Sequence, residues 1–377
     1  MKKILTIVML ALMLALMFAS IGFVSAAGGS ITIPGTIGVE DFRPIVWECG
    51  DRVLLDEEVQ PWRVSNASQN IVERTQNYIF DGETYQVDVV VFDKGKIEDV
   101  QTDLTLSQDG QTVNYTLNCI PTTQIQHFAK CNAKIGEEVI TTYDASKMKS
   151  YKCSIVIPDS EHMYGQYYMS VRAKRGTQSS SLNEFTQWFI NPIISVTLDG
   201  SLNFGSNIRP GTSAFSPTVQ VKNVGDGGVL LDMFIVGRDW QPTGTNLGRC
   251  WDKDLGTYVN YLPLSSFRYK AVNGAWSTST DAQIDKGYSS VKRNRDAAGY
   301  VNINRLINAG FEEKMFDDAE IIQAGTPVIS GKGYSANVIT QGSTGMALTF
   351  RLDLPEPCYG SFASSSTGGF VIYGEAI

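Results

Sequence analysis

The segment Phe215–Gly237, FSPTVQVKNVGDGGVLLDMFIVG, constrains the fold more than any other stretch of this sequence. Val219 and Val221 alternate with polar residues, and this two-residue period places apolar side chains on one face of a β-strand. The glycine-rich segment Asn223–Gly228 follows, and glycine readily adopts the positive φ angles of a chain reversal. Val229–Val236 is almost wholly apolar, which is typical of a strand covered on both faces. A strand, a turn and a buried strand in succession predict a β-sandwich.

The pattern of short strands and turns also runs through the first half of the chain. The clearest strand there is Gly82–Phe92, and Asp109-Gly110 is a hairpin signal between two further strands. Asn191-Pro192 interrupts the strand pattern, because proline fixes φ and lacks an N–H donor. We therefore predict an all-β protein of two β-sandwich domains, the first immunoglobulin-like over 28–192 and the second over 193–377.

The N-terminal segment predicts export from the cytoplasm. Lys2-Lys3 precedes the apolar run Ile4–Val24, and Val24-Ser25-Ala26 has the small residues that a signal peptidase requires. Met1–Ala27 is therefore predicted to be a signal peptide. Because the apolar run is about 20 residues long, an uncleaved membrane anchor is the alternative. In both cases the rest of the chain is expected to be secreted or displayed at the cell surface.

The charge of the chain excludes two classes of partner. Its 377 residues include 31 Lys and Arg and 39 Asp and Glu, which gives a formal net charge of −8. Nucleic acids and anionic lipid headgroups attract basic surfaces. We therefore expect no nucleic acid as a partner, and contact with a membrane only through an uncleaved N-terminal segment.

Six cysteines are expected to form disulfide bonds, because an even number in an exported chain favours pairing. Cys250 and Cys358 are the only cysteines of the second domain, so they form the natural pair there. The other four cysteines permit three pairings. Of these, we predict Cys119–Cys131 together with Cys49–Cys153.

The sequence contains no recognised catalytic motif. The two histidines, His127 and His162, lie outside any familiar active-site pattern, and no HExxH, GxSxG, P-loop or GxGxxG is present. A glycosidase needs only two carboxylates that are close in space, and nothing among the 39 acidic residues marks such a pair. We therefore predict that the protein is not an enzyme.

Asp252 and Asp254 form the best candidate for a metal site. Carboxylates two residues apart in a loop match part of a calcium-binding loop, but the glycine and the glutamate that complete the motif are absent. Calcium is the only cofactor that the sequence suggests. The alternative is an acidic turn in contact with solvent.

Aromatic residues in and beside the loops of the second domain are the candidate binding residues. They are Trp240, Trp251, Tyr258 and Trp276. A tryptophan in a loop is either packed against other side chains or available to a ligand, because exposing an indole to water is costly. Exposed rings could stack on the faces of sugars or contact another protein; packing in the core is the alternative.

Two Asn-X-Ser/Thr sequons, at Asn66 and Asn114, are candidate sites of N-glycosylation. So short a motif often arises by chance. Modification would require both asparagines to be exposed.

Several motifs resemble those of a family of secreted two-domain cell-surface proteins of archaea. They are spread over most of the mature chain and comprise Val46–Asp56, Met163–Ala173, Trp188–Pro192, Arg209–Asn223, Val229–Gly237 and segments of Leu354–Ile377. The resemblance implies a structural role and no substrate. The second domain is also similar to jelly-roll and fibre-protein sandwich domains of extracellular fibre and adhesion proteins, which implies that Gly28–Glu40 could donate a strand to a neighbouring copy.

These observations favour a cell-surface structural or interaction protein. It would self-associate or adhere to other surface proteins through its edge strands and loops. The alternative is a carbohydrate- or ligand-binding module that uses the tryptophan-bearing loops of the second domain, with a glycan as its partner.

Overall fold

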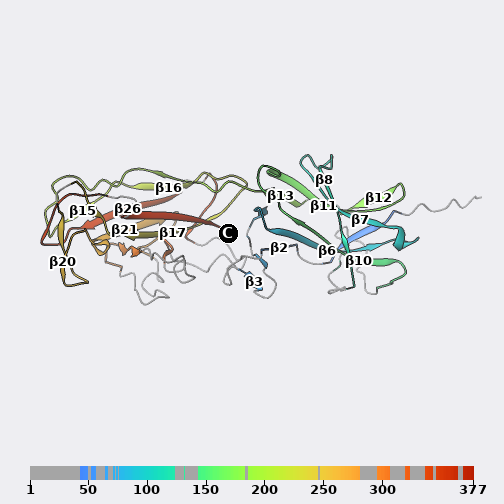
Figure 1. Ribbon diagram of the computed structural model, residues 1–377, viewed down its shortest axis with the longest axis horizontal. Helices are drawn as coiled ribbons and strands as arrows, with labels where there is room; N and C mark the ends of the chain where they lie inside the picture. The colour runs from blue at the N-terminus through green and yellow to red at the C-terminus, as the bar shows by residue number, and fades with distance from the viewer. Residues whose placement is uncertain are drawn as a thin grey trace, which may run out of the picture. The chain divides into compact units, whose positions relative to one another are not determined.

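The computed structural model (Figure 1) describes residues 43–49, 52–56, 64–66, 71–72, 74, 76–123, 131, 143–182, 186–244, 247–280, 295–305, 319–322, 336–342, 345–363 and 368–377. Its elements are β-strands and two short 3-10 helices, Ile97–Asp99 and Leu264–Ser266, so the predicted all-β class is confirmed. Within the described ranges, no helix has the length and apolar character needed to cross a membrane. The predicted signal segment Met1–Ala27 and the predicted donor strand Gly28–Glu40 lie outside these ranges.

The strands before Asn191 form two sheets. The first has the order β3-β4-β2-β6-β10-β9, with β1 also beside β6. Its strands are β1 Ile45–Glu48, β2 Val53–Leu55, β3 Val64–Asn66, β4 Ile71–Val72, β6 Thr84–Phe92, β9 Ile120–Thr122 and β10 Met148–Val156. The second has the order β5-β13-β11-β7-β8, with β12 also beside β11. Its strands are β5 Tyr78–Ile79, β7 Gln101–Ser107, β8 Tyr115–Asn118, β11 Gly165–Arg175, β12 Gln178–Ser181 and β13 Thr186–Ile190.

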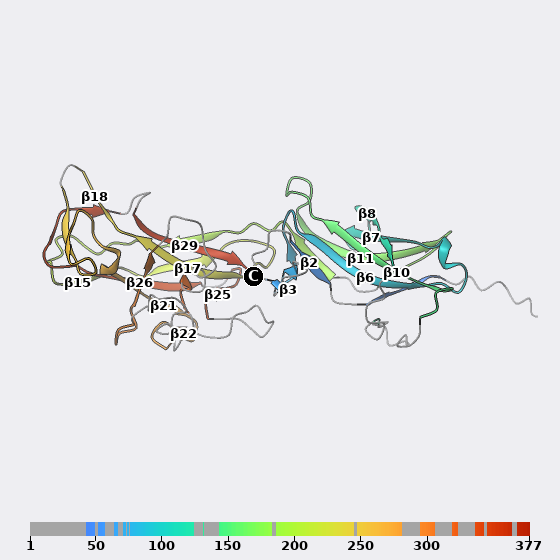
Figure 2. The same ribbon diagram turned by 60° about the horizontal axis from the view of Figure 1, so that its bottom comes forward.

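The strands after Asn191 form four further sheets. The largest has the order β14-β16-β26-β21-β22, with β15 beside β26 and β23 beside β21. Its strands are β14 Val196–Asp199, β15 Ser213–Phe215, β16 Val219–Asn223, β21 Phe267–Asn273, β22 Trp276–Ser277, β23 Val301–Asn302 and β26 Met346–Asp353. The next sheet contains β17 Leu231–Arg238, β24 Asn304–Arg305, β25 Val338–Ile339 and β29 Gly369–Ala376. Figure 2 shows β29 running along β17, in an antiparallel pair.

Two small sheets complete the second half of the chain. One joins β18 Gln241–Pro242 to β28 Phe362–Ala363. The other has the order β20-β19-β27 and contains β19 Arg249–Asp252, β20 Thr257–Val259 and β27 Cys358–Tyr359. Among the described residues, no sheet combines strands from before and after Asn191. The division into an immunoglobulin-like domain and a second sandwich stays a prediction.

The segment Phe215–Gly237 folds as its apolar pattern predicts. Val219 and Val221 of β16 are buried, and the reversal that follows contains Gly227 and Gly228 at φ angles of 64° and 76°. β17 is then covered on both faces. Its residues Leu231, Met233 and Ile235 join the large core, while Phe234 and Val236 pack on the opposite side, against Ala319 and Tyr373.

The structure confirms one predicted disulfide and corrects the other two. Cys250 is bonded to Cys358, as predicted, but the first four cysteines pair as Cys49–Cys131 and Cys119–Cys153. The predicted Cys49–Cys153 bond is wrong because the two side chains lie on opposite faces of one sheet. Cys153 is opposite Val87 of β6 and faces the main core, whereas Cys49 packs on the other face with Val90. Three disulfides are typical of a protein in an oxidising environment, such as the exterior of the cell.

Candidate functional site

Among the described residues of the second half, the sheet β20-β19-β27 carries two exposed aromatic side chains, Tyr258 and Tyr359. Figure 1 shows β20 at the end of this half that lies opposite the C-terminus. β19 and β20 form a hairpin whose turn is held by Asp252, because its Oδ1 accepts the backbone N–H groups of Asp254 at 2.9 Å and Leu255 at 3.2 Å. Gly256 completes the turn at a φ of 61°, a conformation that favours glycine.

The pairing of the three strands sorts their side chains onto two faces. Residues directly opposite each other in an antiparallel pair project from the same face of the sheet. Arg249 is opposite Tyr359, and Trp251 is opposite Tyr258. Cys250, which alternates with them, is opposite both Cys358 and Val259, and all three are buried.

One face of this sheet is therefore aromatic and open to solvent. We call Arg249, Trp251, Tyr258 and Tyr359 the aromatic face. Tyr359 is 60% exposed and Tyr258 is 44% exposed, Arg249 is also exposed, and Trp251 is half-buried. The opposite face carries the Cys250–Cys358 bond and Asp252, so the rings stand on a covalently linked and hydrogen-bonded support.

The members of the aromatic face contact one another. The rings of Trp251 and Tyr258 meet at a right-angled, T-shaped contact with 5.2 Å between their centroids. The guanidinium carbon of Arg249 lies 4.5 Å from the centre of the Tyr258 ring, within the range of a cation–π interaction. These contacts hold the side chains in place while leaving large parts of them available to a ligand.

Two of the predicted binding residues lie elsewhere. Trp240 is only 8% exposed and stacks on Phe267, with ring centroids 4.7 Å apart, so it is packed in the core, which is the alternative that the sequence left open. Its apolar surface is instead covered by the core, which includes Phe370. Trp276 is 49% exposed, but it lies at the β21–β22 hairpin in another sheet. Of the four predicted residues, the structure thus brings Trp251 and Tyr258 together.

Asp252 and Asp254 do not converge as two free ligands. Asp252 is 3% exposed, and its carboxylate accepts the backbone hydrogen bonds of the turn, including the N–H of Asp254 itself. Those contacts explain the spacing of the two residues as a turn motif. Among the described residues, no three metal-binding side chains gather into one group. Calcium at this pair stays a prediction.

The remaining candidates are surface groups. His162 is exposed, and 2.6 Å separates its Nδ1 from Oδ1 of Asp159, which also accepts the backbone N–H of His162. His127 and the side chain of Asn66 lie outside the described residues. Asn114 is exposed, and its side-chain Oδ1 accepts a hydrogen bond from the backbone N–H of Gln108. Its glycosylation, and the absence of enzymatic activity, stay predictions.

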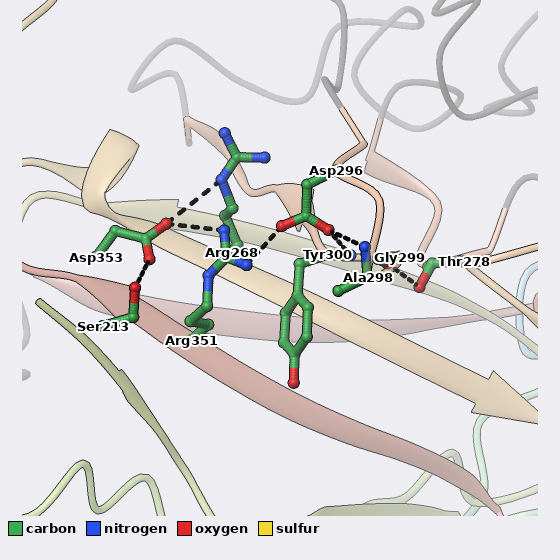
Figure 3. Close-up of polar contacts among 9 residues, drawn as sticks. All are labelled: Ser213, Arg268, Thr278, Asp296, Ala298, Gly299, Tyr300, Arg351 and Asp353. Carbon is green, nitrogen blue, oxygen red and sulfur yellow. Dashed lines mark hydrogen bonds and ion pairs between the residues drawn. The ribbon is translucent and has the colours of Figure 1, made fainter.

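A cluster of polar side chains lies on the outer face of the seven-stranded sheet of the second half, which contains β26 (Figure 3). Arg351 of β26 donates to Asp296 at 2.5 Å and to Asp353 at 2.9 Å. Ser213 of β15 donates to Asp353 at 2.6 Å, and the Arg268 guanidinium approaches the same carboxylate. The cluster links strands β15, β21 and β26 to the turn that contains Asp296, which gives it a structural role.

The surroundings of Asp296 favour its ionised form. Burial raises the pKa of this carboxyl group, but hydrogen bonds from the backbone of Tyr300 and from Arg351, together with the charge of Arg351, outweigh burial and lower the pKa below its ordinary value. The Arg351 guanidinium also lies 5.0 Å from the centre of the Tyr300 ring. A group whose pKa is lower in the folded than in the unfolded state stabilises the fold above its unfolded pKa, and this contribution is lost as the pH falls through the folded pKa.

Replacing Asp296 with asparagine is expected to lower the free energy of unfolding by about 1 kcal/mol at about pH 7, because a partly buried, charge-assisted pair is lost. At about pH 3 the difference between the variant and the unchanged protein should shrink, since below the ordinary pKa of aspartate the unfolded chain binds a proton that the folded state disfavours. Urea denaturation at both pH values measures the effect. Asp199→Asn is the control, because its ion pair with Lys222 is much more exposed and should contribute little at either pH. A difference for Asp296→Asn that grows as the pH falls would contradict the assignment.

The comparisons with known proteins give no family. No protein-family model matches the sequence, and no protein of curated function matches it. Among solved structures, the C-terminal domain of the antigen I/II-family protein AspA of Streptococcus pyogenes is 8% identical over 89% of this chain and 96% of its own, with a TM-score of 0.31. The C-terminal domain of the antigen I/II polypeptide BspA of Streptococcus agalactiae is 10% identical over 86% of this chain and 98% of its own, with a TM-score of 0.24. At such TM-scores the likeness carries no argument about function, and the resemblance to archaeal surface proteins stays an expectation.

Proposed function

We propose that this chain is an extracellular interaction protein that adheres to another surface molecule through its aromatic face. The observation that carries the proposal is the strand register, which projects Arg249, Trp251, Tyr258 and Tyr359 from one open face. Aromatic side chains and arginine dominate binding energies at recognition surfaces, and the rings of tyrosine and tryptophan bring large contact areas at a small cost in conformational entropy. The three disulfides support an extracellular setting.

The support beneath the aromatic face favours recognition. A binding surface gains affinity when its side chains are already held in the bound arrangement, because less freedom is lost on association. The Cys250–Cys358 bond fixes β27 beside β19, and the N–H of Trp251 donates to the carbonyl of Pro357 at 2.9 Å. Tyr359 and Trp251 are therefore placed by covalent and backbone contacts rather than by a loop alone.

The proposal predicts that Trp251→Ala combined with Tyr359→Ala weakens binding by about tenfold or more, because two ring surfaces are removed from the contact. The test uses the full chain, purified without reductant, on a panel of immobilised purified polysaccharides and secreted proteins. Trp276→Ala is the matched control, since this exposed tryptophan lies in a different sheet and its loss should leave binding unchanged.

Three outcomes separate the functions. Binding that depends on Trp251 and Tyr359 but not on Trp276 supports the proposal. Binding that depends only on Trp276 contradicts it and would mean that the binding site lies at the β21–β22 hairpin. A chain that binds nothing on the panel but forms filaments or sheets in electron microscopy would instead be a self-assembling structural protein, whose contacts use edge strands such as β9, where Ile120 is 66% exposed.

A further inference from the structure

We infer that the ligand of the aromatic face is an acidic saccharide, a chain of hexuronic acid units; this inference rests on the proposed function. Arg249 carries the only charge of the aromatic face, and within the described part of the chain its guanidinium contacts the Tyr258 ring and no carboxylate. The protein as a whole has a net charge of −8. An exposed, unneutralised cation in an acidic protein therefore selects a ligand that is negatively charged at this point.

The position of Arg249 suits recognition of a carboxylate. Its guanidinium lies over the ring of Tyr258 on one neighbouring strand, and its backbone is paired with Tyr359 on the other. Stacking on a ring limits the directions in which the planar guanidinium points, while the N–H groups at its edge stay free to donate. A guanidinium group binds a carboxylate through two parallel N–H···O hydrogen bonds, which strengthen binding and fix the orientation of the carboxylate.

The rings account for the rest of such a ligand. An aromatic ring has a negative face, which attracts the positively polarised C–H groups on the apolar side of a sugar ring. Arg249 and Trp251 are two residues apart on β19, about 7 Å between their Cα atoms, so one saccharide reaches both. Because Trp251 and Tyr258 meet at a right angle, the surface offers a ring face and a ring edge side by side.

Other ligands use only part of this surface. A neutral sugar would cover the rings but leave the guanidinium without a charged partner. Inorganic phosphate or a phosphate headgroup would pair with Arg249 but leave three aromatic side chains in contact with water. A hexuronate carries a carboxylate and an apolar C–H face in one small unit, so it pairs with the Arg249 guanidinium and also covers the aromatic rings.

The test compares two polymers with the same sugar backbone, one with ionised carboxylates and one with uncharged methyl esters in their place. Polygalacturonate and its methyl ester are immobilised in calcium-free buffer, and the binding of the full chain, purified without reductant, is measured by biolayer interferometry. We expect Arg249→Gln to weaken binding to polygalacturonate by about tenfold or more, since a charge-assisted pair is lost. Lys253→Gln is the matched control, because it removes the same charge from the exposed turn beside the aromatic face and should change binding by less than about twofold. Methyl esterification should weaken binding of the unchanged protein as much as Arg249→Gln does.

The possible results separate this inference from the proposed function. Equal binding to both polymers that depends on Trp251 would overturn the acidic ligand and leave the aromatic face in place as a neutral-sugar site. Equal losses for Arg249→Gln and Lys253→Gln would show unspecific charge attraction and overturn it too. Binding to a protein surface but to neither polymer, with dependence on Trp251 and Tyr359, would replace the saccharide with a protein partner. Failure to bind any polysaccharide or protein surface would overturn both proposals.

Discussion

Replacing Trp240 with alanine is expected to lower the free energy of unfolding by about 3–5 kcal/mol, the range for truncating a large buried aromatic side chain. Trp240 is 8% exposed, and its indole contacts three other rings, those of Phe204, Phe267 and Phe370. Removing it leaves a cavity that these rings, fixed by their own strands and loops, fill only in part. Among the described residues its indole N–H has no hydrogen-bond partner, so the loss is one of packing.

Urea denaturation followed by circular dichroism measures this effect, with Trp276→Ala as the control. Trp276 is 49% exposed, so its truncation should change the free energy of unfolding by less than about 0.5 kcal/mol. Similar effects of the two substitutions would mean that Trp240 is not part of the core. In that case the earlier interpretation of Trp240 as a ligand contact would regain its basis.

The two tryptophans show what could be predicted from sequence and what could not. Strands with a clear period, such as Val219–Asn223, and the hairpin at Asp109-Gly110 between β7 and β8 were predictable, because alternation and turn chemistry act between near neighbours. Trp240 lies in a short irregular segment with no period. Whether such a ring is buried depends on Phe267 and Phe370, which are far along the chain and brought together by the fold.

The candidate site was predictable in part for the same reason. Trp251 and Tyr258 stand out as aromatic residues near a turn, but Arg249 and Tyr359 have no local signal. A usable signal was nevertheless present in the prediction that Cys250 and Cys358 pair. Residues that flank two bonded cysteines lie close together, and in an antiparallel pair Arg249 falls opposite Tyr359.

To predict the disulfides of the first half, one must know on which face of the β6 sheet each cysteine lies. The spacing of the cysteines along the sequence does not give this. Cys49 and Cys153 both belong near β6, and sequence spacing gives no reason to separate them. Cys49 follows β1, where its N–H donates to the carbonyl of Asp88, while Cys153 is opposite Val87. Because consecutive residues of a strand project to opposite faces, a shift of one position along β6 places the two sulfur atoms on different sides of the sheet.

Removing the Cys250–Cys358 bond by a double substitution to alanine is expected to lower the free energy of unfolding by about 4–5 kcal/mol. The bond joins residues separated by 108 positions, and closing so long a loop restricts the unfolded chain strongly. The matched control is the double alanine variant of Cys119–Cys153, which closes a separation of 34 positions. In each pair one cysteine is 0% and the other 7% exposed, so similar packing is lost in both variants. The difference in loop length alone should make the Cys250–Cys358 variant less stable by about 1 kcal/mol.

The same variant tests how the aromatic face is supported. Without the bond, β27 is joined to β19 only by the pairing of Arg249 with Tyr359 and of residue 250 with residue 358. Tyr359 should then lose its fixed position beside Arg249, and binding should weaken even under conditions in which the chain remains folded. Removing Cys119–Cys153, which lies in the first half, should leave binding unchanged. If both variants bound equally well, the bond would not support the site, and the aromatic face would owe its arrangement to the Asp252 turn and the backbone pairing alone.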